Sequence, residues 1–378
     1  MKVFLDNAAT TPIDSEVVKS MTHVLENVYG NPSSTHSLGR KARACIETAR
    51  KEVAALLHTA PSTIFFTSGG TEADNTAIRC GIDCYDIKHA ITSATEHHAV
   101  LYPLQALEKE GKINLSYVNI CEDGHVDLDH LRELLATNER SFVSLMHANN
   151  EIGSLMDLKK AGEICKEYDA LFHSDTVQTM GHYAMDLEDL NIDFLTCSAH
   201  KLHGPKGIGF LYINPNIKIN PFIYGGSQER NQRGGTENIY GIVGLAKSLS
   251  LAYEHMEEHH NHIQGLKNHM IEKLKMAIPG VAFNGDINPE KSLYTVLNVC
   301  LPQSDMGEML LFNLDIAGIC ASGGSACSSG TDIGSHVLQA LGDASKRPNV
   351  RFSFSRLNTI EEIDYTVEKL ASLFPVNA

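Results

Sequence analysis

A lysine and a carboxylate in this sequence each follow a short apolar run, where they can do chemistry. Lys201 closes the Ser-Ala-His-Lys segment after the run Phe194 to Cys197, and a lysine held there can form a Schiff base with a carbonyl compound. Asp175 follows the run Ala170 to Phe172, with the neutral hydrogen-bonding side chain of Gln178 three residues further on. Taken singly, a surface lysine and a solvated loop aspartate are the simpler interpretations.

Two further polar segments also follow predicted strands. Thr67 to Asp74 contains two glycines and reads as a tight turn that opens a helix, with Thr71 and Asp74 as a capping pair. The free N–H groups of such a helix start can hold a phosphate. His97, in the segment Thr95 to His98, carries an imidazole that can lie flat against an aromatic ring. Pyridoxal phosphate (PLP) requires a lysine, a carboxylate for its ring nitrogen, a phosphate cradle and a stacking group, so the combination predicts a PLP site.

One cysteine lies in a segment with the composition of a flexible linker. Residues 321–330 consist of small and polar residues around Cys327. No apolar run surrounds this cysteine to bury it, so we interpret it as a reactive thiol rather than a structural one.

An arginine near the end of the chain lies in a segment that alternates apolar and polar residues. If Val350 to Arg356 is a strand, Arg351 faces away from Phe352 and Phe354. Such an arginine can clamp a carboxylate through two hydrogen bonds, although a surface salt bridge is an equally simple interpretation.

The elements that position these residues alternate short apolar runs with helix-like stretches, the pattern of an α/β domain with a mainly parallel sheet. In such sheets ligands bind beyond the carboxyl ends of the strands, where the polar segments lie. Seven strands are predicted, at Thr63–Thr67, His89–Ser93, Ile113–Asn119, Ser141–His147, Ala170–Ser174, Phe194–Cys197 and Gly209–Ile213.

The 378 residues exceed the ~250 to 300 at which single domains usually stop growing, so we expect two domains. Ile239 to Ile278 reads as long helices, and further strand candidates such as Tyr294 to Leu301 follow. We predict a large domain over residues 12–256 and a smaller α+β domain formed by residues 1–11 and 257–378, which carries the cysteine segment.

Charge and composition exclude several classes of partner. With 31 basic and 46 acidic residues the net charge is -15, which predicts no nucleic-acid partner and no anionic membrane surface. The first residues do not have the pattern of a signal peptide and no stretch has membrane-spanning length, so we expect a cytoplasmic protein without a membrane partner. Nine cysteines without CxxC pairs indicate a reduced compartment, with neither a disulfide framework nor a structural zinc site.

Six short motifs occur along the chain in this order: Asp6-Asn7-Ala8-Ala9-Thr10-Thr11, Gly30-Asn31-Pro32-Ser33-Ser34, Ser68 to Asp74, Asn149-Asn150-Glu151-Ile152-Gly153, Ser198 to Lys201 and Ser325-Ala326-Cys327. With them the chain resembles the cysteine desulfurases, PLP enzymes of the class-V aminotransferase family, almost from end to end. The resemblance implies the aspartate-aminotransferase-like fold of PLP fold type I, with a mainly parallel seven-stranded sheet. It also implies a homodimer with active sites at the subunit interface.

The resemblance assigns the residues around the cofactor ring. It implies that Lys201 is the Schiff-base lysine and that His97, also catalytic, stacks on the pyridine ring. Asp175 would pair with the ring nitrogen and Gln178 would reach the phenolic oxygen.

The same resemblance assigns the two ends of the site. The phosphate would be held by Gly70, Thr71, Ser198 and His200, and by Thr236 of the neighbouring subunit. Asn150 and Arg351 match the contacts to the substrate carboxylate.

The implied reaction removes sulfur from L-cysteine and leaves L-alanine and a persulfide on Cys327. A protein acceptor then receives the sulfur for iron–sulfur cluster assembly or tRNA thiolation. Selenocysteine lyases and cysteine sulfinate desulfinases share the cofactor residues and stay open as alternatives.

A metal site can be argued from a histidine-rich segment. His255 and His259 share a helical face, with His260 and His262 close by. The run Glu254 to His262 is polar nearly all round, which is typical of a solvated helix face, so we predict no metal site.

Overall fold

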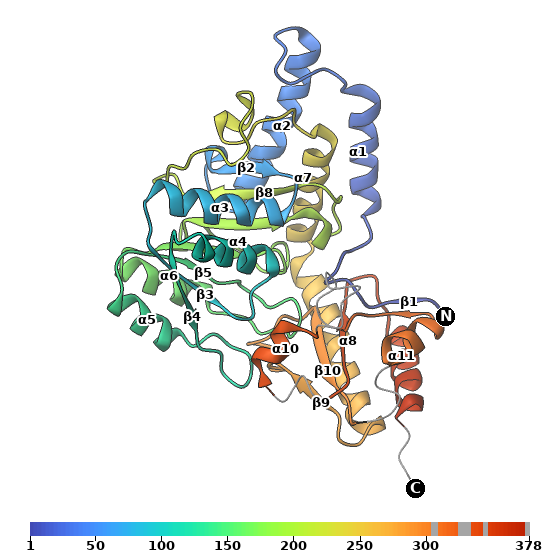
Figure 1. Cartoon of the computed structure of the whole chain (residues 1–378). Coiled ribbons are helices and arrows are strands. Elements are labelled where there is room, and N and C mark those ends of the chain that lie inside the picture. Colours follow the sequence, from blue (N-terminus) through green and yellow to red (C-terminus); the bar gives the residue numbers. More distant parts are fainter. Residues whose placement is uncertain (304–308, 324–333, 343–346, 375–378) are drawn as a thin grey trace.

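The computed structural model describes residues 1–303, 309–323, 334–342 and 347–374. Its largest sheet has seven strands in the order β2-β8-β7-β6-β5-β3-β4 (Figure 1). Strand β8 is antiparallel to both neighbours and the other pairings are parallel. All seven predicted strands are confirmed, with limits that differ by up to three residues: β2 Ile64–Thr67, β3 His89–Ser93, β4 Asn114–Val118, β5 Ser141–Ser144, β6 Leu171–Asp175, β7 Phe194–Ser198 and β8 Gly209–Ile213.

Helices cover both faces of this sheet, which explains why its central strands β5, β6 and β7 are buried along their whole length. Helices α3 and α4 share one hydrophobic core with Phe142 and Phe194. The opposite core contains Phe172 and residues of the other helices that pack on the sheet. The helices of this body are α1 Ser15–Asn27, α2 Ser37–Leu56, α3 Gly70–Cys84, α4 His98–Lys109, α5 Leu128–Thr137, α6 Leu158–Glu167 and α7 Ile239–Glu254.

A second body, at the lower right of Figure 1, is built on an antiparallel sheet of order β12-β10-β9. Its core is separate and includes Phe352, on the side of β12 opposite Arg351, and Phe354 just after the strand, as the alternation predicted. Its elements are α8 Met256–Ala277, β9 Ala282–Asn284, β10 Val296–Cys300, α9 Leu310–Ile316, α10 His336–Ala340, β12 Asn349–Ser353 and α11 Ile360–Leu373, with β1 Val3–Phe4 paired to β11 Ile319–Cys320. The predicted fold class is confirmed.

The change of core occurs between α7 and α8, at His255. Residues of α7 pack under the seven-stranded sheet, whereas residues of α8 pack on the three-stranded one. On this basis we propose the domain limits given above, 12–256 for the large domain and 1–11 with 257–378 for the small one.

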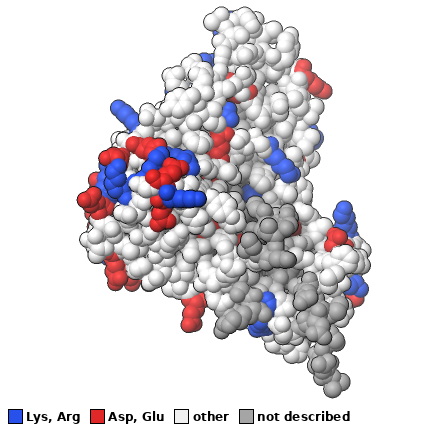
Figure 2. Space-filling model, viewed as in Figure 1, with Lys and Arg blue, Asp and Glu red and all other residues white. Residues whose placement is uncertain are grey.

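On the face shown in Figure 2, acidic and basic side chains lie interspersed, and many of them gather over α3 and α4. No field of positive charge that could follow a nucleic-acid backbone is visible on this face. Within the part of the chain that the structure describes, no helix combines the length and apolar character needed to cross a bilayer.

The sheet core gives a direct test of the fold. Phe172 is 1% exposed whereas Phe312 on α9 is 57% exposed. We expect Phe172→Ala to lower the free energy of unfolding by ~3 to 5 kcal/mol, because a buried cavity replaces the ring. The matched change Phe312→Ala should stay within about 0.5 kcal/mol. Urea unfolding followed by circular dichroism measures both, and equal effects would contradict the assigned burial.

Candidate active site

Most of the predicted site residues lie around one pocket, at the carboxyl ends of the parallel strands of the seven-stranded sheet. The pocket has an empty volume of about 960 Å³. Ten of the predicted residues line it: Gly70, Thr71, His97, Asn150, Asp175, Gln178, Ser198, His200, Lys201 and Arg351. They come from segments up to 281 positions apart, and the strand ends bring them together as expected.

The start of helix α3 forms one end of the pocket. Its N-cap Gly69 offers no side chain to the first N–H groups of the helix, so these groups suit an anion. A Cβ atom at Gly70 would lie 2.9 Å from Cγ2 of Val177. Only glycine therefore lets the helix start approach the loop after β6 this closely.

Polar side chains surround this helix start. Thr71, the buried Ser198 and His200 line both the main pocket and an adjoining hollow, which Lys206 also lines. Burial, and then the nearby Lys201 and Lys206, lower the pKa of His200 to about 4, so its imidazole is neutral at pH 7. Lys206 was not singled out from the sequence, where it reads as one more basic residue in a glycine-rich turn.

The capping pair predicted from Thr71 and Asp74 is wrong. Helix α3 begins at Gly70, so Thr71 is already inside its first turn. Asp74 is 1% exposed, and its Oδ1 lies 3.3 Å from Nε2 of His173. The carboxyl of Asp74 belongs to the core beneath the pocket rather than to the helix end.

Lys201 lies at the end of a short 3-10 turn, Ala199–Lys201, directly after β7. Its Nζ donates hydrogen bonds to the carbonyl oxygens of Ala8 at 2.6 Å and Ala9 at 2.9 Å. Gln178 Nε2 donates to the same Ala8 oxygen at 3.1 Å. The Asp6–Thr11 motif therefore holds the lysine in place, a role that could not be read from its sequence.

Two buried carboxyls line the same pocket as the lysine. Asp175 ends strand β6, and its Oδ1 accepts a hydrogen bond from the N–H of Val177 at 2.9 Å. Burial, and then the Asp74 carboxylate, raise the pKa of Asp175 from 3.8 to about 7, although Lys201 acts in the opposite direction. Burial raises the pKa of Asp74 to about 7 as well, and its Oδ1 has no hydrogen-bond partner among the described residues.

His97 is the N-cap of helix α4. Its Nδ1 accepts a hydrogen bond from the N–H of Ala99 at 3.1 Å, so Nε2 carries the ring proton. Burial, and then the charge of Lys201, lower the pKa of His97 to about 4. The ring is therefore neutral at pH 7 and can lie against an aromatic ligand without introducing a charge.

Arg351 reaches the pocket from strand β12 of the second body and is 1% exposed. Its guanidinium donates to Asn150 O at 3.0 Å and to Asp6 Oδ1 at 2.9 Å. Its Nε has no hydrogen-bond partner among the described residues. A buried arginine with an unsatisfied N–H is suited to an anionic ligand.

Several pocket residues were missed from the sequence. His98 and His336 line the pocket with ring centroids 4.5 Å apart, and His336 Nε2 lies 2.9 Å from Glu96 O. The hydroxyl of Ser335 donates to the buried carboxyl of Glu151. Helix α10 is thereby fixed to two loops of the large body, and no local pattern in the sequence signals this contact.

Two predicted site residues are not placed in the pocket. Thr236 is exposed and lines a different hollow, together with Ser68, Gly207 and Arg233. Cys327 lies outside the described residues. The roles of both remain predictions.

The chain is similar to known proteins over nearly its whole length. The family model for class-V aminotransferases matches residues 3–366. The putative cysteine desulfurase IscS 1 of Bacillus subtilis (strain 168) is 40% identical over 377 residues, 98% of each chain. The solved NifS-like protein of Rickettsia africae ESF-5 matches with a TM-score of 0.89 and 33% identity over 100% of both chains. A solved structure of SspA in complex with cysteine matches with a TM-score of 0.81 and 30% identity, covering 95% of this chain and 100% of that one. The chain belongs to the class-V aminotransferase family and, within it, to the cysteine desulfurases.

Proposed function

We propose that this protein is a PLP-dependent cysteine desulfurase, which converts L-cysteine to L-alanine and holds the released sulfur as a persulfide on Cys327. The observation that carries the proposal is the pocket in which Lys201, the buried Asp175 and the open start of helix α3 converge. The similar SspA structure is a complex with cysteine, which supports the choice of substrate.

The charges of the pocket fit PLP. Asp74 and Asp175 form a buried acidic pair, and a protonated pyridine nitrogen at Asp175 would supply a cation that stabilises the carboxylate form. At the other end, the start of α3 and the side chains of Thr71, Ser198 and His200 suit a phosphate.

We assign the contacts as follows. Lys201 is the covalent attachment point, Asp175 pairs with the ring nitrogen and His97 stacks on the ring. Gln178 reaches the phenolic oxygen, while Asn150 and Arg351 bind the substrate carboxylate. Bound PLP supplies an electron sink for the carbon next to the substrate amine.

The chain's own groups then orient substrate and move protons. Arg351, fixed by Asp6 and the carbonyl of Asn150, orients the substrate carboxylate. Lys201 Nζ, positioned by the carbonyls of Ala8 and Ala9, takes the proton of the substrate α-carbon and returns it. Neutral His97 adds no charge against the ring.

Sulfur transfer requires a thiolate. The Cys327 thiolate attacks the substrate sulfur, so an S–S bond forms and the substrate C–S bond breaks. The electron pair of that bond stays with carbon, which takes up a proton to become the methyl group of alanine. The sulfur remains on Cys327 until an acceptor takes it.

We further propose a homodimer in which Thr236 completes the phosphate site of the partner subunit. The exposed Thr236 and the separate hollow that it lines support a contact outside its own pocket. We propose a cytoplasmic protein that passes sulfur to a protein acceptor for iron–sulfur cluster assembly or tRNA thiolation.

The reaction can be tested with Cys327→Ala. The purified protein should absorb visible light and release alanine and sulfide in equal amounts from L-cysteine with a reductant. We expect Cys327→Ala to lower this turnover by at least ~10³-fold while the visible absorbance stays, because the nucleophile is lost and the cofactor residues are unchanged. The control Cys121→Ser replaces another thiol, which is exposed, and should keep full activity. Full turnover of cysteine by Cys327→Ala would favour a selenocysteine lyase or sulfinate desulfinase instead.

The pairing of Asp175 can be tested through stability. An ordinary aspartate carboxyl has a pKa of 3.8, whereas the pKa of Asp175 in the folded protein is about 7. Between these two pH values the carboxyl of Asp175 is therefore ionised in the unfolded chain but protonated in the folded one. In PLP-free protein, rising pH should therefore destabilise the wild type relative to Asp175→Asn, by at most about 4 kcal/mol near pH 8. With PLP bound the order should reverse, because the ring nitrogen stabilises the carboxylate. Calorimetric melting of both proteins at pH 5 and pH 8 measures this, and a pH-independent difference would contradict the assignment.

A further inference from the structure

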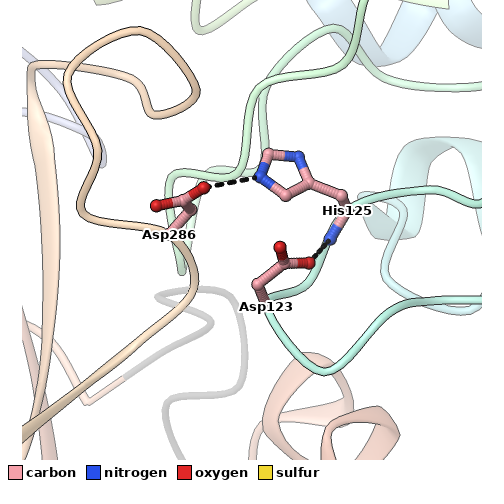
Figure 3. Close-up of side chains that lie close together, drawn as sticks. All are labelled: Asp123, His125 and Asp286. Atoms are coloured by element: carbon pink, nitrogen blue, oxygen red, sulfur yellow. Dashed lines mark hydrogen bonds and ion pairs between the residues drawn. The ribbon is translucent and has the colours of Figure 1, made fainter.

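Three potential metal-ligating side chains from the two bodies meet away from the active-site pocket. Asp123 and His125 lie on the turn between β4 and α5, and Asp286 lies on the loop after β9. Their donor atoms all lie within 4.8 Å of one another. Figure 3 shows the carboxylate of Asp286 facing the ring of His125, whereas the carboxylate of Asp123 faces the backbone nitrogen of the same residue.

The two turns that carry these residues are held against the same segment of chain. Gly124 has φ +80°, and a Cβ atom there would lie 2.4 Å from Cδ1 of Ile152. Gly285 has φ +79°, and a Cβ atom there would lie 2.4 Å from Ile152 O. Ser154 Oγ donates to Asp123 O at 3.0 Å. The three donors are therefore held by close packing and do not depend on one long flexible side chain.

The donor set determines which ion would fit. One imidazole with two carboxylates is a mixed nitrogen and oxygen set, which suits Zn²⁺ and related transition ions with a water as fourth ligand. Ca²⁺ takes six to eight oxygen ligands and Mg²⁺ prefers oxygen in an octahedron, so both match the imidazole poorly. Asp123 is exposed whereas His125 and Asp286 are half-buried, so an ion can reach the cluster from solvent.

The distances allow a shared ion. His125 Nε2 lies 3.3 Å from Asp286 Oδ2, close to the separation of two ligand atoms bound to one Zn²⁺ at about 2.0 Å each. Asp123 Oδ1 accepts a hydrogen bond from the backbone N–H of His125, which keeps its carboxylate within 4.8 Å of the other two donor atoms. Without an ion, the contact between the two bodies here is the polar contact of His125 with Asp286, and a metal ion would replace it with a stronger bridge.

We propose that Asp123, His125 and Asp286 bind a divalent transition-metal ion, with Zn²⁺ as the best match, and that the ion links the large body to the small one. The two turns that carry the three residues pack against Ile152, two positions along the chain from the pocket residue Asn150. The proposed metal site is a structural site, separate from the desulfurase chemistry. It departs from the expectation of no metal, and its members are invisible as a motif because Asp286 is 161 positions from His125.

Zn²⁺ titration of the PLP-loaded protein tests the proposal. After chelator treatment, calorimetric titration with Zn²⁺ in the Cys327→Ala background should show one site per chain that Asp286→Asn and His125→Gln each weaken at least ~100-fold. A hundredfold excess of Zn²⁺ over its dissociation constant should raise the melting temperature by about 3 °C, and Asp286→Asn should remove this rise. The Cys327→Ala background removes the thiol that is expected to be reactive and could bind Zn²⁺ itself. Two variants, Asp286→Asn and His125→Gln, are used so that the test still works if one of them does not fold.

Two control variants separate the competing binding sites. Cys121→Ser replaces the exposed thiol on the same turn, and His255→Asn replaces a member of the histidine-rich helix. Both should bind Zn²⁺ like the parent. Loss of binding in either control, with binding kept in Asp286→Asn, would overturn the proposal. A melting temperature that falls equally in Asp286→Asn with and without Zn²⁺ would also overturn it, since it would show an ion pair alone.

Discussion

The active site depends on the hydrogen bonds of one short segment, Asp6–Thr11, which makes a turn between the two bodies. Its carbonyl oxygens hold Lys201 and Gln178 from the large body. Its Asp6 carboxylate holds Arg351 from the small body. Since these are the groups proposed to attach the cofactor and orient the substrate, one short segment sets the relative position of both ends of the pocket.

Burial controls which groups of the pocket are charged, because it shifts the pKa values of carboxylic acids and of imidazoles in opposite directions. It raises the pKa of Asp175 and lowers those of His97 and His200, so the apolar surroundings favour neutral groups. An ionisable group in such a site becomes charged only where a partner of opposite charge stabilises the charged form. The proposed ring nitrogen at Asp175 and the anion at Arg351 are both partners of this kind, which is why a PLP-bound amino acid suits a pocket that is otherwise costly to ionise.

Much of the fold could be predicted because most of the seven strands are short, buried segments whose hydrophobic pattern is local. The convergence of Lys201, Asp175 and His97 also followed from a general property of parallel sheets. The capping role of Thr71 and Asp74 could not be judged correctly, because the nearby core around His173 takes up the Asp74 carboxyl.

Contacts between residues that are far apart in the sequence could not be predicted, because they produce no local sequence pattern. Arg351 pairs with Asp6 across 345 positions, and His336 contacts Glu96 across 240. The packing of the two bodies against each other decides which arginine is buried and which histidine reaches the pocket. The periodicity of the sequence contains no information about that packing. Taken singly, Lys201 could not be separated from an ordinary surface lysine, and only its combination with Asp175, His97 and the turn Thr67 to Asp74 predicted a PLP site.

The long span of the Asp6–Thr11 contacts has a consequence for biosynthesis. Asn7 donates to Ser353 O at 2.8 Å across 346 positions, so Asn7 finds this partner only after the 346 residues that follow it have been made. At ~5 to 20 residues per second, translation of that interval takes roughly 20 to 70 s. During this time the seven-stranded sheet can fold beneath an N-terminal segment that has no strand to dock on. The pocket can therefore be completed only after β12, which carries Arg351 and Ser353, has been made.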